Sequence, residues 1–233
     1  HALRQTDGSV VELTHVYRQS GRVFIDLLNK VRDNQADAQV LSLLNSRYVP
    51  NFKPREEEGY IRLTTHNAMA QQINNAELEK LPGQTYMFKA VVEGKFPELS
   101  FPTDEVLELK KDAQVMFVKN DSSPEKRYYN GMIGRVTAIN ERGFVVQPKG
   151  TNEAIEVAPE EWENNRYELD EQTKEIKEVR EGLFRQYPIK TAWAITIHKS
   201  QGLTFCHAII DASLSFAHGQ TYVALSRCKT LDG

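Results

Sequence analysis

The sequence predicts an α/β fold that is interrupted by a small inserted β-barrel. Two observations predict it. The chain up to Gly83 follows the order β, α, α, β, α, which is typical of helices layered on a sheet. After Gly83 the pattern changes to short alternating runs with Gly and Asn turns, which is typical of a small barrel or sandwich. The helical period returns after Pro188, so we expect the α/β part to resume there.

Each element of the α/β part rests on a local pattern. Apolar residues at i, i+4 and i+8 predict a helix over Val23–Val31, and a similar pattern predicts one within Gln35–Arg47. Thr64 or Thr65 is expected to cap a helix that runs to about Lys80, before Pro82. The other predictions are strands at Ser9–Thr14, Tyr60–Leu63 and His207–Asp211, and helices at Ala192–Gln201 and Gly219–Arg227.

The inserted part is predicted as short strands followed by a polar hairpin. The strands are expected at Tyr86–Val92, Val106–Lys110, Ala113–Lys119, Met132–Asn140, Phe144–Pro148 and Ala154–Val157. The hairpin joins Tyr167–Leu169 to Ile176–Val179. We therefore divide the chain into a start at 1–8, an α/β part at 9–105, the insertion at 106–187 and the rest of the α/β part at 188–233.

Composition narrows the functional classes. Apolar residues make up 40% and charged residues 26% of the 233 residues, which fits a globular chain. No apolar run is long enough for a membrane span, so no membrane partner is expected. Two cysteines, Cys206 and Cys228, are expected to be reduced thiols, and no metal site is expected. None of the 13 glycines lies in the phosphate-binding frame G-x-x-x-x-G-K-[ST], so the chain by itself should not hydrolyse ATP.

The charge is distributed unevenly along the chain. The net charge is −3, but Glu153–Glu181 holds eleven acidic and four basic residues. The remaining residues are therefore weakly basic. A basic surface beside an acidic one is compatible with nucleic acid bound on one side, although a solvated charge mosaic gives the same composition.

Six ordered blocks carry a resemblance to a known family. Near the end, residues 191–205 read TAWAITIHKSQGLTF and residues 216–228 read FAHGQTYVALSRC. These resemble motifs V and VI of the RecD-like group of superfamily-one helicases, and their wording is closest to the PIF-one family of DNA helicases. LTHVYRQ at 13–19 resembles motif IV, and TTHNAMA at 64–70 resembles motif IVa. VMFVKND at 115–121 and YYNGMIG at 128–134 resemble the family's inserted barrel.

The resemblance implies the second RecA-like, P-loop NTPase-type motor domain of a 5′→3′ DNA helicase, with an inserted SH3-like β-barrel. It also implies that a first motor domain lies upstream of His1 and binds most of the ATP and Mg²⁺. The implied partners are that domain and single-stranded DNA or a DNA fork. The implied location is the bacterial cytoplasm, associated with the nucleoid, or the nucleus or mitochondrion of a eukaryote.

The resemblance also assigns residues to the nucleotide. Arg18 and Arg227 stand where the family places arginine fingers, and a planar, always-ionised guanidinium stabilises charge on a transferring phosphoryl group. A surface salt bridge is the alternative for each arginine. Gln201 and Gly202 are expected beside the nucleotide and its ribose, where glycine permits close backbone approach. Gln220, with His218, is expected to relay between the nucleotide and the DNA.

A second set of residues is assigned to single-stranded DNA. Tracking along DNA needs small polar and basic groups that contact phosphates without reading bases. The resemblance places them in two segments: Thr65, His66 and Asn67, and Thr196, His198 and Lys199. Stacking on a base and core packing are the two alternatives for Trp193, and its neighbours Ala192, Ala194 and Ile195 favour core packing. Lys119, Lys126 and Arg127 are candidates for phosphate contact, with a solvated loop as the equal alternative.

Two other functions stay open from the sequence. A non-enzymatic nucleic-acid-binding or adaptor module would have the same shape, but it would have no use for Arg18 and Arg227 as fingers. A RecD-like subunit of a nuclease-helicase, or the helicase domain of a relaxase, would use the same motifs.

Overall fold

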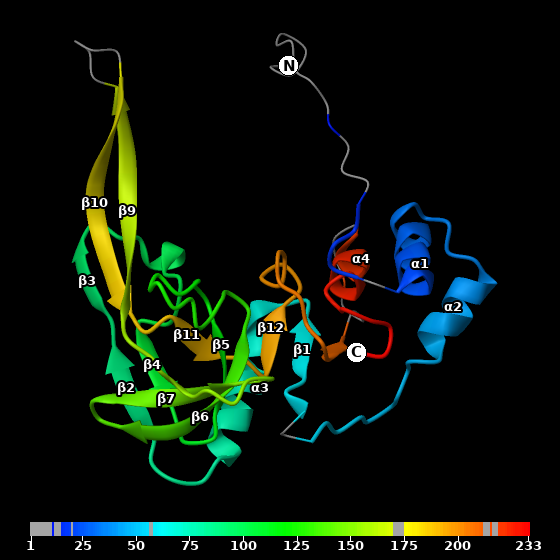
Figure 1. The fold of residues 1–233 in the computed structure, drawn as a ribbon, viewed down its shortest axis with the longest axis horizontal. Helices are drawn as coiled ribbons and strands as arrows, with labels where there is room; N and C mark the ends of the chain where they lie inside the picture. Colours follow the sequence, from blue (N-terminus) through cyan, green and yellow to red (C-terminus); the bar gives the residue numbers. More distant parts are fainter. Residues whose placement is uncertain are drawn as a thin grey trace.

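The computed structural model describes residues 11, 15–19, 21–55, 58–169, 175–211, 215 and 219–233. It is a mixed α/β protein in which helices and a small parallel sheet lie beside a larger group of antiparallel strands (Figure 1). The predicted strand at Ser9–Thr14 falls, apart from Val11, outside the described residues. No helix among the described residues has the length and apolar character that crossing a membrane requires.

The parallel sheet has the order β12-β1-β13 and is built from distant parts of the chain. β1 (Ile61–Thr64) pairs on one side with β12 (Ala194–Thr196) and on the other with β13 (Ala208–Ile210). Ile61 and Leu63 are fully buried in a core with the residues around β12. α3 (Asn67–Lys80) follows β1 and packs against β12. The strands predicted at Tyr60–Leu63 and His207–Asp211 are therefore confirmed.

Three helices form a separate core at the other side of this sheet. α1 (Arg22–Arg32), α2 (Ala38–Asn45) and α4 (Gln220–Leu225) confirm three predicted helices. Asp37 caps α2 by accepting a hydrogen bond from the backbone N–H of Val40 at 2.9 Å. The buried members of this core are Phe24, Leu27, Leu28, Val40 and Cys228.

Two predictions in the α/β part are wrong. Ala192–Gln201 is not a helix: it contains β12, followed by turns at 197–202, so Gln201 and Gly202 end a turn. A strand buried on both faces is apolar throughout, and such a short run cannot be told from a buried helix by its period. Thr64 and Thr65 do not cap α3, because the N-cap is His66 and Thr64 is the last residue of β1.

The largest group of strands forms a five-stranded sheet with the order β11-β5-β6-β7-β8. Its members are β5 (Gln114–Phe117), β6 (Ile133–Asn140), β7 (Gly143–Pro148), β8 (Ile155–Glu156) and β11 (Ile189–Thr191). Among the described residues β8 and β11 do not pair with each other, so the expected barrel is not closed by strand pairing. β8 and β11 are the two edge strands of this sheet. Phe117, Val136 and Val146 are buried in its hydrophobic core.

Three further strands and a short 3₁₀ helix (Glu98–Ser100) complete this region. β2 (Tyr86–Lys89) pairs with β4 (Val106–Leu109). The run predicted at Tyr86–Val92 is split at Ala90 into β2 and β3 (Val91–Gly94). The division of the chain at residues 105/106 stays a prediction; β2 and β3 precede it and pair with β4 and β10, which follow it.

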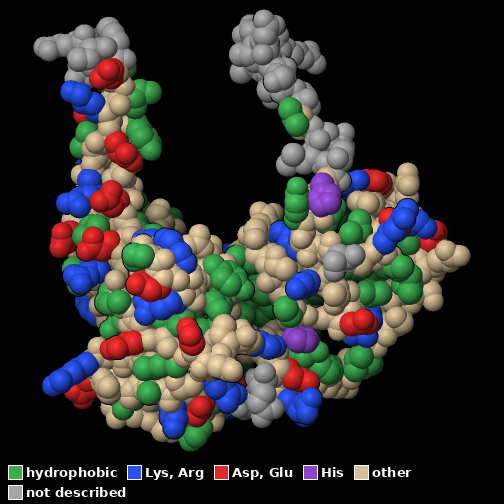
Figure 2. All heavy atoms as spheres, viewed as in Figure 1, with side chains coloured by type: hydrophobic (Ala, Val, Ile, Leu, Met, Phe, Trp, Pro, Cys, Tyr) green, Lys and Arg blue, Asp and Glu red, His purple; other side chains and the backbone are tan. Residues whose placement is uncertain are grey.

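A hairpin arm projects from this region (Figure 1). It is formed by β9 (Glu160–Leu169) and β10 (Ile176–Gln186), so the predicted hairpin is present but much longer than expected. β3 adds a third strand only at the base, opposite Gly182–Arg185. A Cβ on Gly182 would lie 2.3 Å from the carbonyl oxygen of Lys95, so this close approach requires glycine. Charged side chains cover one side of the arm, and apolar side chains gather on the other (Figure 2).

Candidate functional site

Arg18 and Arg227 are separated by most of the chain but meet at one pocket. The pocket has a volume of about 500 Å³ and lies between the segment at 15–19, α1 and the end of α4. The Arg18 Nε donates to Thr204 Oγ1 at 2.9 Å, and its Nη1 donates to the Ser226 carbonyl at 3.1 Å. The Arg227 Nε donates to the Val223 carbonyl at 3.0 Å, and its Nη2 donates to Ser226 Oγ at 2.7 Å. Both guanidiniums are thus held in place.

The chain reaches this geometry through backbone contacts at the end of α4. α4 begins after Gly219, whose φ of +78° favours glycine. After α4, Cys228 forms a parallel bridge with Phe205, and Phe205 N–H donates to the Arg227 carbonyl at 2.9 Å. The Gln19 side chain donates to the carbonyls of Ser226 (2.9 Å) and Cys228 (3.0 Å), which ties the Arg18 segment to the Arg227 segment.

The electrostatics of the pocket favour an anion. Among the described residues neither Arg18 nor Arg227 forms an ion pair with a carboxylate; their partners are carbonyl and hydroxyl oxygens. Burial, together with the nearby charge of Arg18, lowers the pKa of the Arg227 guanidinium. Arginine stays ionised in proteins, so two like charges are held side by side. A multivalent anion such as a polyphosphate would relieve that repulsion.

The second predicted set of residues meets at one edge of the parallel sheet. Thr64 and Thr196 are register partners at the carboxyl ends of β1 and β12. The Ile197 N–H then donates to the Thr64 carbonyl at 2.8 Å. Consequently Thr65, His66 and Asn67 at the start of α3 lie beside the turn that carries His198 and Lys199. The orange loop after β12 rises on the same side of the molecule as the arm (Figure 1).

This edge offers both hydrogen-bond donors and positive charge. His66, Asn67, His198 and Lys199 are exposed, whereas Thr65 and Thr196 are buried and fix the backbone. Thr65 Oγ1 lies 2.8 Å from His66 Nδ1, and Thr196 Oγ1 accepts from the Lys199 N–H at 3.3 Å. Backbone N–H groups in the first turn of a helix have no intrahelical partner and bind phosphate well. The arrangement can therefore hold a phosphate backbone without reading bases.

The chain is similar to part of several known proteins. No protein family profile matches the sequence. The chain is 33% identical to the ATP-dependent DNA helicase PIF1 of Mus musculus over 96% of its length, and 31% identical over 89% of its length to Pif1 of Psychrobacter sp.. Unliganded Pif1 from Bacteroides sp. matches 96% of the chain at 40% identity with a TM-score of 0.85. The chain is homologous to part of the Pif1 helicases.

The relationship covers only a portion of those proteins. The chain spans about a third of the two curated Pif1 relatives (34% and 38%) and about half (51%) of the unliganded Bacteroides Pif1 structure. Bacteroides Pif1 in complex with ADP-AlF₄ gives a TM-score of 0.84, and the same protein bound to single-stranded DNA gives 0.67. The present fold is therefore nearer to the Pif1 structures without DNA.

Three residues that the Pif1 motifs assign to the nucleotide are not in the arginine pocket. Gln201 and Gly202 are exposed at the end of the turn after β12, where the φ of Gly202 is +82°. Gln220 is buried as the first residue of α4. None of the three is among the residues that line the pocket, and His218 lies outside the described residues. Their nucleotide roles stay predictions.

The structure adds residues that the Pif1-like motifs did not single out. Gln19, Thr204 and Ser226 position the two arginines, and only the adjacency of Gln19 to Arg18 would have indicated one of them. Lys190 on β11 is a further addition. Burial, with the like charge of Lys199, lowers the pKa of Lys190 to about 8. Its charge thus belongs to the same positive region as Lys199, and no sequence pattern indicated this.

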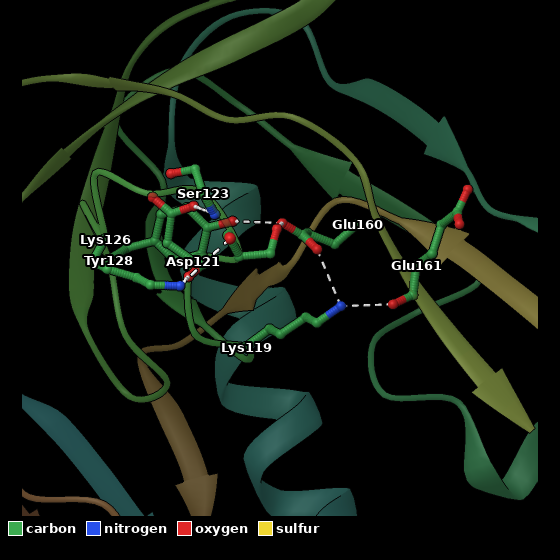
Figure 3. Close-up of polar contacts among 8 residues, drawn as sticks. Lys119, Asp121, Ser123, Lys126, Tyr128, Glu160 and Glu161 are labelled. Atoms are coloured by element: carbon green, nitrogen blue, oxygen red, sulfur yellow. Dashed lines mark hydrogen bonds and ion pairs between the residues drawn. The ribbon is translucent and has the colours of Figure 1, made fainter.

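The basic loop between β5 and β6 behaves differently from the arginine pocket. Lys119 Nζ donates to Glu160 Oε2 at 3.1 Å and to the Glu161 carbonyl at 2.6 Å (Figure 3). Asp121 accepts from the N–H groups of Ser123 and Arg127, both at 2.9 Å. Lys126 Nζ donates to the Asp121 carbonyl at 3.0 Å. These basic side chains therefore hold the loop to itself and to the base of the arm.

The structure describes two more features that bear on a site. Trp193 is half-buried and packs against the core of the five-stranded sheet, in agreement with the core interpretation. Within the described part of the chain no three His, Cys, Asp or Glu side chains cluster as metal ligands. Cys206 and Cys228 are free thiols.

Proposed function

We propose that this chain is the second RecA-like motor domain, with an inserted SH3-like β-barrel, of an ATP-dependent 5′→3′ DNA helicase. The observation that carries the proposal is the meeting of Arg18 and Arg227 at one pocket, with no carboxylate partner among the residues that the structure describes. The relatives named ATP-dependent DNA helicase PIF1 support it. A RecD-like subunit would use the same residues, but the named relatives favour the Pif1 type.

In this proposal the pocket receives the γ-phosphate of ATP from a first motor domain upstream of His1. Arg18 and Arg227 stabilise the charge that develops on the transferring phosphoryl group. The residues fit this group, because the two adjacent guanidiniums have no counter-charge among the described residues and the pocket of about 500 Å³ has space for phosphates. Mg²⁺, which neutralises phosphate charge when bound, is assigned mainly to the upstream domain, as are most ATP contacts. Gln201, Gly202 and Gln220 are proposed to lie toward the nucleotide.

Single-stranded DNA would lie along the carboxyl edge of β1 and β12. His66, Asn67, His198 and Lys199 would contact phosphates, with the buried Thr65 and Thr196 shaping the two loops. Structures of Bacteroides Pif1 with single-stranded DNA, and a Pif1 structure described as unwinding forked DNA, support DNA partners of this kind. Closing and opening of the two motor domains would shift with nucleotide affinity and alternate the grip on DNA. Such a protein would act in the nucleoid of a bacterium, or in the nucleus or mitochondrion of a eukaryote.

Unwinding polarity tests the proposal. The full polypeptide that contains this chain is mixed with duplexes that carry either a 5′ or a 3′ single-stranded tail. We expect ATP-dependent strand separation with the 5′ tail and none with the 3′ tail. The 233-residue chain alone should bind single strands in a salt-sensitive way but should not hydrolyse ATP. Unwinding from the 3′ tail, or ATP turnover by the chain alone, would overturn the corresponding part of the proposal.

A further inference from the structure

A second groove lies at the opposite end of the parallel sheet from the proposed DNA edge. It has a volume of about 690 Å³ and lies between the carboxyl half of α3, the segment at 52–55 and the start of β1. Tyr60 and Trp193, which precede β1 and β12, line it, whereas Thr65 and His198 follow those strands. Because the two strands are parallel, the groove and the proposed DNA edge are at opposite ends of the sheet.

The lining of the groove is strongly basic. Five basic side chains line it against two acidic ones: Lys53, Arg55, Arg62, Lys80 and Arg135 against Glu77 and Asp112. Lys80 pairs with Glu77 at 2.7 Å, and Arg55 pairs with Glu58 at 3.1 Å, so the charge of these two basic groups is largely neutralised. Among the described residues Lys53 and Arg62 form no ion pair. Arg62 is half-buried in the middle of the sheet, so its charge is presented from a rigid strand.

Aromatic rings accompany this charge. Phe52 and Tyr60 have ring centroids 5.1 Å apart, and Tyr60 and His207 are also 5.1 Å apart. His207 Nδ1 in turn lies 3.1 Å from Lys149 Nζ. A row of rings thus leads from the groove to another basic side chain. Aromatic rings in a positively charged groove are typical of sites where bases stack on the rings while phosphates meet Lys and Arg.

We propose that this groove is a second binding site for single-stranded nucleic acid, separate from the edge that carries His198 and Lys199. Bases would stack on Phe52 and Tyr60, and phosphates would contact Lys53 and Arg62. The inference rests on the proposed function in one respect, since a protein that separates strands produces a second single strand to hold. The groove would retain the displaced strand on the far side of the sheet from the translocated one.

Crosslinking of the 233-residue chain tests this site directly. An eight-residue oligothymidylate with one 5-iododeoxyuridine is irradiated with the chain, and crosslinked tryptic peptides are mapped by mass spectrometry. We expect crosslinks at Phe52 or Tyr60, in peptides 48–55 and 56–62, in addition to crosslinks near His198. Crosslinks near His198 alone would overturn the groove and leave the proposed function intact, whereas crosslinks at neither place would count against both.

Charge reversals at exposed positions separate the two sites. Lys53→Glu should lower the crosslink yield at Tyr60 about fivefold or more and leave the yield near His198 unchanged, because it adds repulsion to one phosphate contact. Lys199→Glu should do the reverse. Lys89→Glu, an exposed strand position away from both sites, is the matched control and should change neither.

Two further results would refute the groove. If Lys53→Glu and Lys199→Glu lower both crosslinks in parallel, there is one continuous site. If an acidic peptide such as oligoglutamate, at equal charge, displaces the oligonucleotide from Tyr60 as well as oligothymidylate does, the groove recognises charge alone and suits a protein partner. Arg62→Gln gives an independent check, and its folding is verified by thermal unfolding before the crosslink is compared.

Discussion

Two basic clusters in this molecule differ in what their charges meet. In the β5–β6 loop Lys119 reaches the carboxylate of Glu160 (Figure 3), and Arg127 reaches that of Asp121. At the pocket beside α4 Arg18 and Arg227 meet carbonyl and hydroxyl oxygens, and no carboxylate within the described part of the chain. In the loop the basic side chains are neutralised by carboxylates of the same protein, and these ion pairs stabilise the fold. The second cluster leaves positive charge unneutralised at an accessible pocket, which indicates a ligand with the opposite charge.

The largest effect is expected for substitutions of the two arginines at the pocket. Arg227→Lys or Arg18→Lys in the full polypeptide should lower kcat for DNA-stimulated ATP hydrolysis about 10³-fold, because lysine cannot reproduce the guanidinium geometry. Thermal stability should change little. Steady-state ATPase assays provide the measurement. Arg47→Lys, at an exposed pair with Asp232, is the control and should retain wild-type turnover. Normal turnover in both finger variants would make the two clusters functionally equivalent.

Asp121→Asn tests whether the charge of Asp121 stabilises the β5–β6 loop. Burial by itself raises the pKa of Asp121, but hydrogen bonds from Ser123 and Arg127 outweigh it and lower the pKa to about 2. A lowered folded-state pKa contributes stability that is complete above about pH 4 and is lost as the pH falls through 2. We expect the variant to lose about 2 kcal/mol of unfolding free energy at pH 7, with the difference from wild type narrowing below pH 4. Urea unfolding at several pH values measures this.

The same variant separates structure from function. ATP hydrolysis per folded molecule should stay close to the wild-type value, since Asp121 lies outside the arginine pocket. A difference in stability that does not change between pH 6 and pH 3 would show that the carboxylate charge is not what holds the loop.

Lys190 is intermediate between the two clusters, because both a like charge and an opposite charge lie near it. Its nearby charges are Lys199, which lowers its pKa, and Asp104, which raises it, while burial has the largest effect and brings the pKa to about 8. A phosphate placed beside Lys190 would favour the charged form. Single-strand affinity should therefore fall severalfold as the pH rises from 7 to 9, and Lys190→Met should flatten that dependence. Fluorescence anisotropy with labelled oligothymidylate at constant salt checks it; an unchanged slope in the variant would exclude Lys190 from the binding face.

The smallest effect is expected for Tyr128→Phe. The Tyr128 hydroxyl donates to Glu160 Oε1 at 3.3 Å, a long bond to a carboxylate that Ser122 and Lys119 already contact. The ring, stacked on Phe117 with centroids 4.2 Å apart, would remain. We expect a loss below about 1 kcal/mol in urea unfolding at pH 7. A loss as large as that of Asp121→Asn would mean that the hydroxyl, and not the charges, organises the loop.

Much of the fold follows from local patterns, and the misses have physical reasons. α1 and α2 obey helical spacing because each buries one stripe. β12 was mistaken for a helix because a short strand that is buried on both faces has no alternation to detect. The outer rungs of the arm were predicted, but the inner part of β9 and β10 was missed. In that part Gly182, Leu183 and Phe184 are buried in succession, so apolar and polar residues do not alternate along β10.

The candidate site was less accessible to sequence reasoning. Arg18 and Arg227 were singled out by motif wording, but their meeting depends on Gln19 bridging to Ser226 and Cys228, which spacing cannot give. The alignment of Thr64 with Thr196 depends on strand order in the sheet. Lys190 carries no sequence signal at all, because its pKa arises from burial and from a neighbour brought close by folding.

The uneven width of the arm has a consequence for local unfolding. Its base is three strands wide and buries Leu183 and Phe184, whereas its outer part has only the rungs between 165–169 and 176–180. A two-stranded ribbon is marginally stable in water. Amide protons in the outer rungs should therefore exchange with deuterium far sooner than those at 183–186. The base of the arm thus stays packed, whereas the outer part opens and re-forms without disturbing the core.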